Sequence, residues 1–213
     1  DLSFEYQLRW HRAGLEHRIR DILKSRQIGA TFYFSREALL HALKTGHNQI
    51  FLSASKTQAY VFREYIIQFA RRVDVELTGD PIVIGNNGAK LIFLGTNSNT
   101  AQSHNGDLYV DEIFWIPNFQ KLRKVSSGMA SQSHLRSTYF STPSTLAHGA
   151  YPFWSGELFN RGRARVSERV DIDISHDALA AGVACPDGQW RQIVTIEDAL
   201  AGGCTLFNLE QLR

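Results

Sequence analysis

The sequence has few cysteines, no long apolar run and no paired histidine motif, and each absence excludes a class of protein. Two of its 213 residues are cysteines, Cys185 and Cys204, without C-x-x-C spacing, so free thiols are expected rather than a disulfide framework. No apolar stretch approaches the roughly 18 residues of a membrane helix, so no membrane partner is expected. The eight histidines form no H-x-x-x-H or H-x-H pair, and His104, His134 and His148 are interpreted as ordinary loop or surface residues. The start, Asp1-Leu2-Ser3-Phe4, lacks Met and a signal peptide, which predicts an excised piece of a longer, non-secreted protein.

The composition is that of a folded domain with an uneven charge. Hydrophobic residues make up 43% and charged residues 21%, which excludes a disordered or collagen-like chain. Residues 1–167 hold 20 Lys and Arg against 13 Asp and Glu, a net charge of +7, whereas residues 168–213 hold 3 against 8, a net charge of −5. The basic part favours a polyanion such as nucleic acid, or a solvated surface. The four tryptophans are interpreted as core residues.

Apolar runs alternate between strand and helix periodicity along the chain. Helices are predicted over 4–15, 32–44, 56–73 and 118–131. Strands are predicted over 17–24, 49–53, 108–110 and 137–141, with a hairpin whose arms, 82–84 and 91–94, flank the turn 85–88. This alternation predicts an α/β fold with a mainly parallel sheet flanked by helices, in which ligands bind at the carboxyl ends of the strands.

The segment after the first strand is a partial match to a phosphate-binding loop. Residues 24–31 read Lys-Ser-Arg-Gln-Ile-Gly-Ala-Thr against the pattern G-x-x-x-x-G-K-[ST]. Gly29 and Thr31 occupy their usual places, whereas Ala30 stands where the lysine is expected and Lys24 replaces the first glycine. Backbone N–H groups of the loop would face phosphates at the helix N-terminus. Lys24 would supply the cation and the Thr31 hydroxyl would bind Mg²⁺; a simple helix cap is the alternative.

Two later strands also end in polar residues. The strand 108–110 runs into Asp111 and Glu112, which suit Mg²⁺ binding and activation of an attacking water, respectively, although acids can also cap a helix. Both acids can approach one nucleotide only if the strand ends and the backbone turns there, because neighbouring side chains of a strand point to opposite faces. The strand 137–141 ends in Ser141-Thr142-Pro143, which either contacts a γ-phosphate or nucleic acid or forms a turn.

Together these segments resemble the ATPase domain of the large terminase subunit of tailed bacteriophages. The segments that carry the resemblance are residues 23–31, 49–55, 94–97, 108–112 and 139–144. The resemblance implies a RecA-type P-loop ATPase with an extra strand and a catalytic glutamate. The implied nucleotide-binding residues are Gln7, as the adenine-reading glutamine, and Lys24, Ser25, Arg26, Gln27, Ile28, Gly29, Ala30 and Thr31.

The family's remaining roles carry over to a few positions. Glu112 and Arg26 are the implied catalytic residues, Thr31 and Asp111 the implied Mg²⁺ ligands, and Ser141-Thr142-Pro143 the implied coupling motif. The resemblance also implies ATP hydrolysis that moves double-stranded viral DNA into a procapsid. The implied partners are the small terminase subunit and the portal, in a homo-oligomeric ring in the host-cell cytoplasm.

The predicted boundaries are a P-loop ATPase core over 1–160 and a lid or linker over 161–213. The latter leads towards an endonuclease domain that only the full-length protein would hold. A strand with two acids on one face is possible over 170–174. Two other functions stay open, a helicase motor domain and a DNA-docking module that binds nucleotide without hydrolysis, which Ala30 favours and Glu112 opposes.

Overall fold

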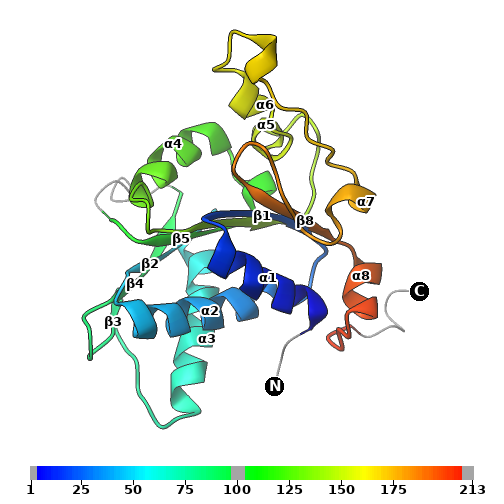
Figure 1. Cartoon of the computed structure of the whole chain (residues 1–213). Helices are drawn as coiled ribbons and strands as arrows, with labels where there is room; N and C mark the ends of the chain where they lie inside the picture. The colour runs from blue at the N-terminus through cyan, green and yellow to red at the C-terminus, as the bar shows by residue number, and fades with distance from the viewer. Residues whose placement is uncertain (1–3, 97–103, 208–213) are drawn as a thin grey trace.

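A single mixed sheet forms the centre of the computed structural model, which describes residues 4–96 and 104–207 (Figure 1). Asn97, the last residue of one segment that carried the resemblance, lies outside these ranges. The strand order is β3-β4-β2-β5-β6-β1-β8-β7. The strands are β1 (Ile19–Lys24), β2 (Gln49–Ser53), β3 (Ile82–Val83), β4 (Lys90–Gly95), β5 (Asp107–Asp111), β6 (Ser137–Ser141), β7 (Val183–Ala184) and β8 (Trp190–Val194).

The pairing between strands agrees with the sequence pattern. All pairs among β4, β2, β5, β6, β1 and β8 are parallel, while β3 and β7 pair antiparallel at the two edges. The four predicted strands that precede residue 142 and the predicted hairpin of β3 and β4 are confirmed. Buried strands of this kind read as continuous apolar runs, because helices cover both faces of the sheet.

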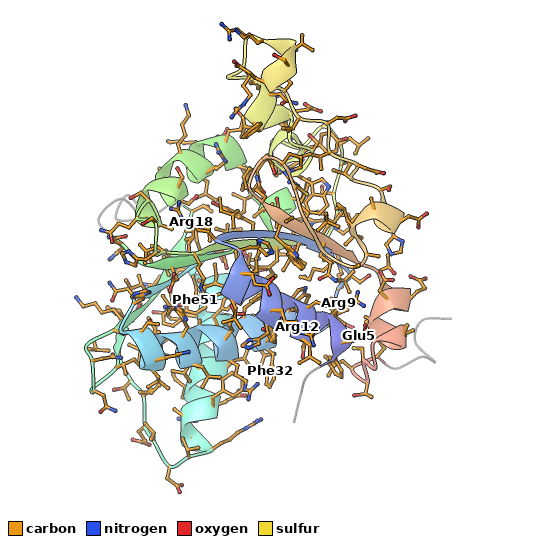
Figure 2. All side chains as sticks on the ribbon, in the orientation of Figure 1. Glu5, Arg9, Arg12, Arg18, Phe32 and Phe51 are labelled. Carbon is orange, nitrogen blue, oxygen red and sulfur yellow. The ribbon has the colours of Figure 1, made fainter. Side chains whose placement is uncertain are left out.

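Helices cover the two faces of the sheet (Figure 1). The helices are α1 (Glu5–Glu16), α2 (Ala30–Thr45), α3 (Lys56–Arg71), α4 (Phe119–Met129), α5 (Tyr151–Trp154), α6 (Glu157–Asn160), α7 (His176–Leu179) and α8 (Ile196–Ala201), with short 3₁₀ turns η2 (Ile113–Trp115) and η3 (Val166–Glu168). The first three lie on one face, over a core that includes Trp10, Phe34 and Phe51 (Figure 2). The other face packs against α4 and the chain that follows it, through Phe119 and Phe153.

The carboxyl-terminal segment contributes to the sheet itself. The sequence pattern predicts a lid or linker over 161–213, but β8 pairs in parallel with β1, and β7 extends the same edge. Residues 183–194 are therefore part of the core, while the boundary at residue 160 stays a prediction. The strand considered over 170–174 is wrong, since those residues form an irregular stretch. Asn160 holds that stretch instead, with both its side-chain amide and its carbonyl bonded to the backbone of Val170.

Candidate active site

Three adjacent strands bring the predicted site residues together at the carboxyl ends of the parallel strands. β6 lies between β1 and β5, with Leu23 opposite Ser141 and Asp111 opposite Phe140. The carboxyl ends of these strands are therefore level. The loop after β1, the acids after β5 and the Ser-Thr-Pro segment after β6 meet there, as the alternation of strands and helices predicts.

The loop between β1 and α2 has the backbone of an anion-binding turn. Gln27 and Gly29 both adopt left-handed conformations, with φ of 59° and 77°. Alternation of this kind turns successive N–H groups towards one side, at the N-terminus of a 16-residue helix. Ile28 is buried and anchors the loop, and its carbonyl accepts a 2.7 Å hydrogen bond from the Tyr6 hydroxyl. Arg26 is exposed.

Gln7 lies against this loop. It is buried in the first turn of α1. A Cβ atom on Gly29 would lie 3.4 Å from Gln7 Nε2 and 3.0 Å from Leu206 Cδ1. The left-handed backbone of Gly29 disfavours any other residue as well. The amide of Gln7 and the C-terminal segment thus border the same turn.

Glu112 stands at the point where β5 ends and the backbone turns. Its φ of 52° and ψ of 48° are left-handed, a conformation uncommon for a residue with a side chain. The turn directs its carboxylate between two neighbours. Oε1 lies 3.1 Å from Lys24 Nζ, while Oε2 accepts hydrogen bonds of 2.9 Å from the Thr142 N–H and 2.8 Å from the Thr142 hydroxyl. The sequence-based expectation that the strand ends between the two acids is confirmed.

The surroundings of the two adjacent acids, Asp111 and Glu112, shift their pKa values in opposite directions. Burial acts to raise the pKa of Glu112, but Lys24 and the Thr142 hydrogen bonds outweigh it and hold that pKa below its ordinary value. Burial, together with the charge of Glu112, raises the pKa of Asp111 to about 7, although Lys24 opposes this. Glu112 is therefore a carboxylate at neutral pH, whereas Asp111 takes up a proton readily unless a cation approaches it.

A second layer of hydrogen bonds holds the Ser-Thr-Pro segment. Trp115 Nε1 donates a 2.8 Å bond to the Thr142 hydroxyl, and the Phe114 N–H donates one of 3.1 Å to Ser141 Oγ. Because Thr142 accepts from Trp115, its own proton is directed to Glu112. The Arg26 guanidinium lies 6.0 Å from the centre of the Trp115 ring, which links the loop to the same network.

The structure brings together most of the predicted residues and adds two. Glu112 contacts both Lys24 and Thr142, and Asp111 adjoins it in the chain. Thr31 is half-buried in the first turn of α2, and its hydroxyl makes no hydrogen bond to Asp111. Sequence reasoning missed Tyr6, since a tyrosine in an amphipathic helix resembles any core residue. It also placed Trp115 in the core with the other tryptophans, but that residue is 50% exposed. Its position three residues after Glu112 was the available signal.

Comparison with known proteins identifies the family. A family model described as "Terminase large subunit, T4likevirus-type, N-terminal" matches residues 21–213. The chain is 88% identical, over 211 residues, to a terminase ATPase subunit of Escherichia phage P2. That alignment includes 99% of this chain but 36% of the relative, so the chain spans about a third of that protein's length.

Solved structures agree with the fold. The ATPase domain of the large terminase of Thermus phage P74-26 matches 94% of this chain, and 84% of its own length, with a TM-score of 0.65 at 16% identity. The large terminase of another thermophilic bacteriophage, solved with ADP, matches 93% of this chain and 47% of its own with the same TM-score at 12% identity. The mainly parallel sheet flanked by helices is the RecA-like fold of those domains. The chain belongs to the terminase large subunit family, of which it carries the N-terminal part.

Proposed function

We propose that this chain is the ATP-hydrolysing motor domain of a phage DNA-packaging terminase. One observation carries the proposal: the carboxylate of Glu112 joins the loop lysine to the coupling threonine, at 3.1 Å and 2.8 Å respectively. A general base that contacts both the phosphate-binding loop and the segment after β6 can transmit the state of the nucleotide to the rest of the domain. The ATPase-subunit name of the phage P2 relative agrees with this function.

Nucleotide binding falls to the loop and its neighbours. The N–H groups of residues 27–31 would hold the phosphates, with Ile28 and Ala30 contributing only backbone. The Ser25 N–H instead donates a 2.8 Å hydrogen bond to the Val194 carbonyl, so Ser25 would contribute through its hydroxyl. Gln7, buried beside Gly29, would read the adenine, and Arg26 would extend from the loop towards the γ-phosphate. The large terminase of a thermophilic bacteriophage, which shares this fold, was solved in complex with ADP, and this supports nucleotide binding by the domain.

The oxygen ligands at this edge suit Mg²⁺. A threonine hydroxyl and an aspartate are hard oxygen donors, and Asp111 has a pKa near 7 that a nearby cation would lower. When bound with the nucleotide, Mg²⁺ would neutralise phosphate charge during transfer. We assign Thr31 and Asp111 to hold it.

Catalysis requires an exchange of partners at Lys24. In the structure Lys24 forms an ion pair with Glu112. Arriving phosphates would attract the ammonium group, because they carry more charge than one carboxylate that Thr142 already satisfies. Glu112 Oε1 would then be free to accept a proton from the attacking water, while Oε2 stays fixed by Thr142. Ser141, Thr142 and Pro143 would transmit that change to the adjoining strand.

The alternatives lose support on particular residues. The helicase alternative loses support because the family model that matches residues 21–213 is that of a terminase large subunit. A docking module without hydrolysis would not require a half-buried glutamate on a left-handed backbone. Strain of that kind is retained where it positions a functional group.

The partners follow from the family. We propose that the assembled ring moves double-stranded DNA past the portal with the small subunit, in the host-cell cytoplasm, and that the endonuclease lies elsewhere in the full-length protein. No helix in the described ranges is both long and apolar enough to cross a membrane. The net charge of +7 over residues 1–167 favours contact with phosphates regardless of base sequence.

The loop lysine provides the experiment. Lys24→Ala should reduce ATP turnover in the assembled full-length motor by at least 10²-fold, since a fixed cation on the phosphates contributes several kcal/mol to transition-state stabilisation. Lys90→Ala, an exposed lysine at the far end of β4, is the matched control. Full ATPase activity in Lys24→Ala would overturn the assignment.

A further inference from the structure

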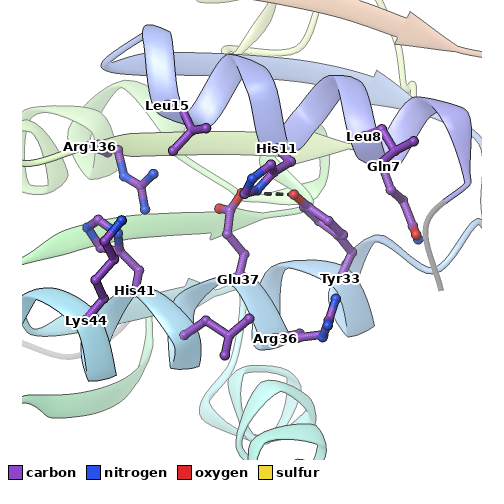
Figure 3. Close-up of a pocket in the computed structure, with 11 residues that line it drawn as sticks. Gln7, Leu8, His11, Leu15, Tyr33, Arg36, Glu37, His41, Lys44 and Arg136 are labelled. Carbon is purple, nitrogen blue, oxygen red and sulfur yellow. Dashed lines mark hydrogen bonds between the residues drawn. The ribbon is translucent and has the colours of Figure 1, made fainter. Parts of the chain in front are cut away.

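Two histidines contact a buried aspartate at the amino-terminal ends of the parallel strands, opposite the proposed nucleotide site. Asp107 is the first residue of β5, and 1% of its surface is exposed. His41, from the last turns of α2, places Nε2 at 3.1 Å from Asp107 Oδ2. His47, just before β2, places Nδ1 at 3.6 Å from the same oxygen. Figure 3 shows His41 at the end of an open hollow between α1 and α2, the end nearest Arg136.

The three ligand atoms are spaced as a metal site requires. They all lie within 4.8 Å of one another. Ligands about 2.0–2.1 Å from a tetrahedral zinc ion are about 3.3 Å apart. Asp107 Oδ2 lies 3.1 Å from His41 Nε2 and 3.6 Å from His47 Nδ1, on either side of that value. Small movements of the side chains would complete the geometry.

The two ring nitrogens lack other partners. His41 Nε2 and His47 Nδ1 are buried atoms, and within the described ranges neither makes a well-aligned hydrogen bond. The Asp107 carboxylate is the group that both approach. Buried polar atoms are nearly always satisfied, and two ring nitrogens that converge on one carboxylate oxygen are arranged as metal ligands are.

The carboxylate is held in place by its own partners. Gln49 Nε2 donates a 2.9 Å hydrogen bond to Asp107 Oδ2, and the Arg136 N–H donates one of 2.8 Å to Oδ1. Such outer contacts fix the orientation of metal ligands and are a usual part of metal sites. The site thus has a rigid base on the sheet and two imidazoles above it.

A third histidine adjoins the cluster from the solvent side. The His134 ring, on the exposed turn before β6, lies 5.0 Å from the His47 ring between centroids. It can complete a four-ligand shell by a rotation of its side chain, and a water would serve otherwise. Imidazole nitrogens with one carboxylate oxygen suit zinc and similar transition metals, whereas Mg²⁺ prefers oxygen ligands throughout.

We propose that His41, His47 and Asp107 bind a zinc-type transition metal ion, with His134 as a fourth ligand. The ion would connect α2 to β5 at this edge of the sheet. The opposite ends of those two elements carry the phosphate-binding loop and the acid pair, so the metal would fix their relative position. The proposal does not depend on the proposed ATPase function, since the residues it uses take no part in it.

Metal binding by the purified 213-residue chain tests the proposal. Titration with Zn²⁺ should give one site per chain with a dissociation constant in the micromolar range or below, and Zn²⁺ should raise Tm. Co²⁺ should give the visible absorption of a tetrahedral site. His41→Gln and His47→Gln should each weaken binding at least tenfold. Both side chains are partly exposed, so these variants should fold, which circular dichroism would check.

A second histidine–aspartate pair supplies the control. His176 Nε2 lies 2.7 Å from Asp198 Oδ2, but no other histidine adjoins that pair in the described part of the chain. His176→Gln should leave metal binding unchanged. No stoichiometric Zn²⁺ or Co²⁺ binding, or equal binding by His41→Gln and His47→Gln, would overturn the proposal and leave a plain ion pair.

Discussion

Thr142 donates two hydrogen bonds to one oxygen of Glu112, from its backbone N–H at 2.9 Å and its hydroxyl at 2.8 Å. This contact joins the first residue after β5 to the first residue after β6. It fixes one carboxylate oxygen and leaves the other to Lys24. The glutamate is thereby both oriented and kept ionised by residues at the ends of two other strands, β1 and β6.

Thr142→Val should distinguish a role of Thr142 in orienting Glu112 from a role in nucleotide binding. The variant keeps the shape and the backbone hydrogen bond but loses the hydroxyl bond to Glu112. We expect kcat for ATP in the assembled motor to fall by about 10–100-fold, the loss typical of a misoriented general base, with nucleotide affinity nearly unchanged. Ser144→Ala, an exposed residue two positions on, is the control. A change confined to affinity would show that Thr142 does not act through the glutamate.

Asp111 should make metal-dependent nucleotide binding depend on pH. Its pKa of about 7 means that the carboxyl group carries a proton below that pH and must lose it to hold a cation. Affinity for a non-hydrolysable ATP analogue with Mg²⁺ should therefore rise as pH increases through 7 and level off above it.

Asp111→Asn provides the matched control for that titration. The terminal phosphate of the nucleotide itself ionises near pH 6, and this contribution is common to both proteins. The variant should bind the ATP analogue with Mg²⁺ more weakly, and its affinity should lack the rise near pH 7 that is attributable to Asp111. Identical pH profiles for the two proteins would exclude Asp111 as a metal ligand.

Asp21 should make the stability of the fold fall with rising pH. Its side chain is fully buried in β1, and neither carboxylate oxygen has a hydrogen-bond partner in the ranges described. Burial raises its pKa to about 7, against the nearby charge of Arg191. The folded state therefore binds a proton that the unfolded state has lost. This contribution is complete below about pH 4 and is lost as pH rises through 7, at about 1.4 kcal/mol for each pH unit.

Asp21→Asn tests this directly, because it removes the titrating group. The free energy of unfolding, measured by denaturant titration between pH 4 and pH 8, should decline less steeply in the variant than in the parent. Asp171→Asn, at an exposed aspartate, should leave the slope unchanged. Equal slopes for Asp21→Asn and the parent, or a steeper decline in the variant, would contradict the predicted sign.

The strand ends could be predicted because apolar runs mark them. Residues 17–24, 108–110 and 137–141 are predicted as strands, and the polar residues that follow them have to meet at the carboxyl ends of a parallel sheet. β8 was missed because its sequence, Trp-Arg-Gln-Ile-Val, places two polar residues in the interior. Asp187 neutralises Arg191, and the Trp10 indole N–H bonds to Gln192 at 2.9 Å. Only the folded chain supplies those partners.

Two other features could not be predicted from spacing alone. The alternation of acids and isoleucines over 170–174 resembles a strand, but Asn160 fixes Val170 in an irregular conformation. His41, His47 and Asp107 are brought together by the parallel arrangement of β2 and β5. A search for histidine pairs within one helix or strand does not detect a site made of three separate segments.

Glu112→Gln tests the central claim most directly. The amide keeps the size of the side chain and can still accept from Thr142, but it cannot take a proton from water. Single-turnover ATP hydrolysis in the assembled full-length motor should fall by about 10²–10⁴-fold while nucleotide affinity stays near that of the parent. Glu64→Gln, at an exposed position of α3, should behave as the parent does. Hydrolysis at a near-normal rate by Glu112→Gln would contradict the assignment of Glu112 as the catalytic base.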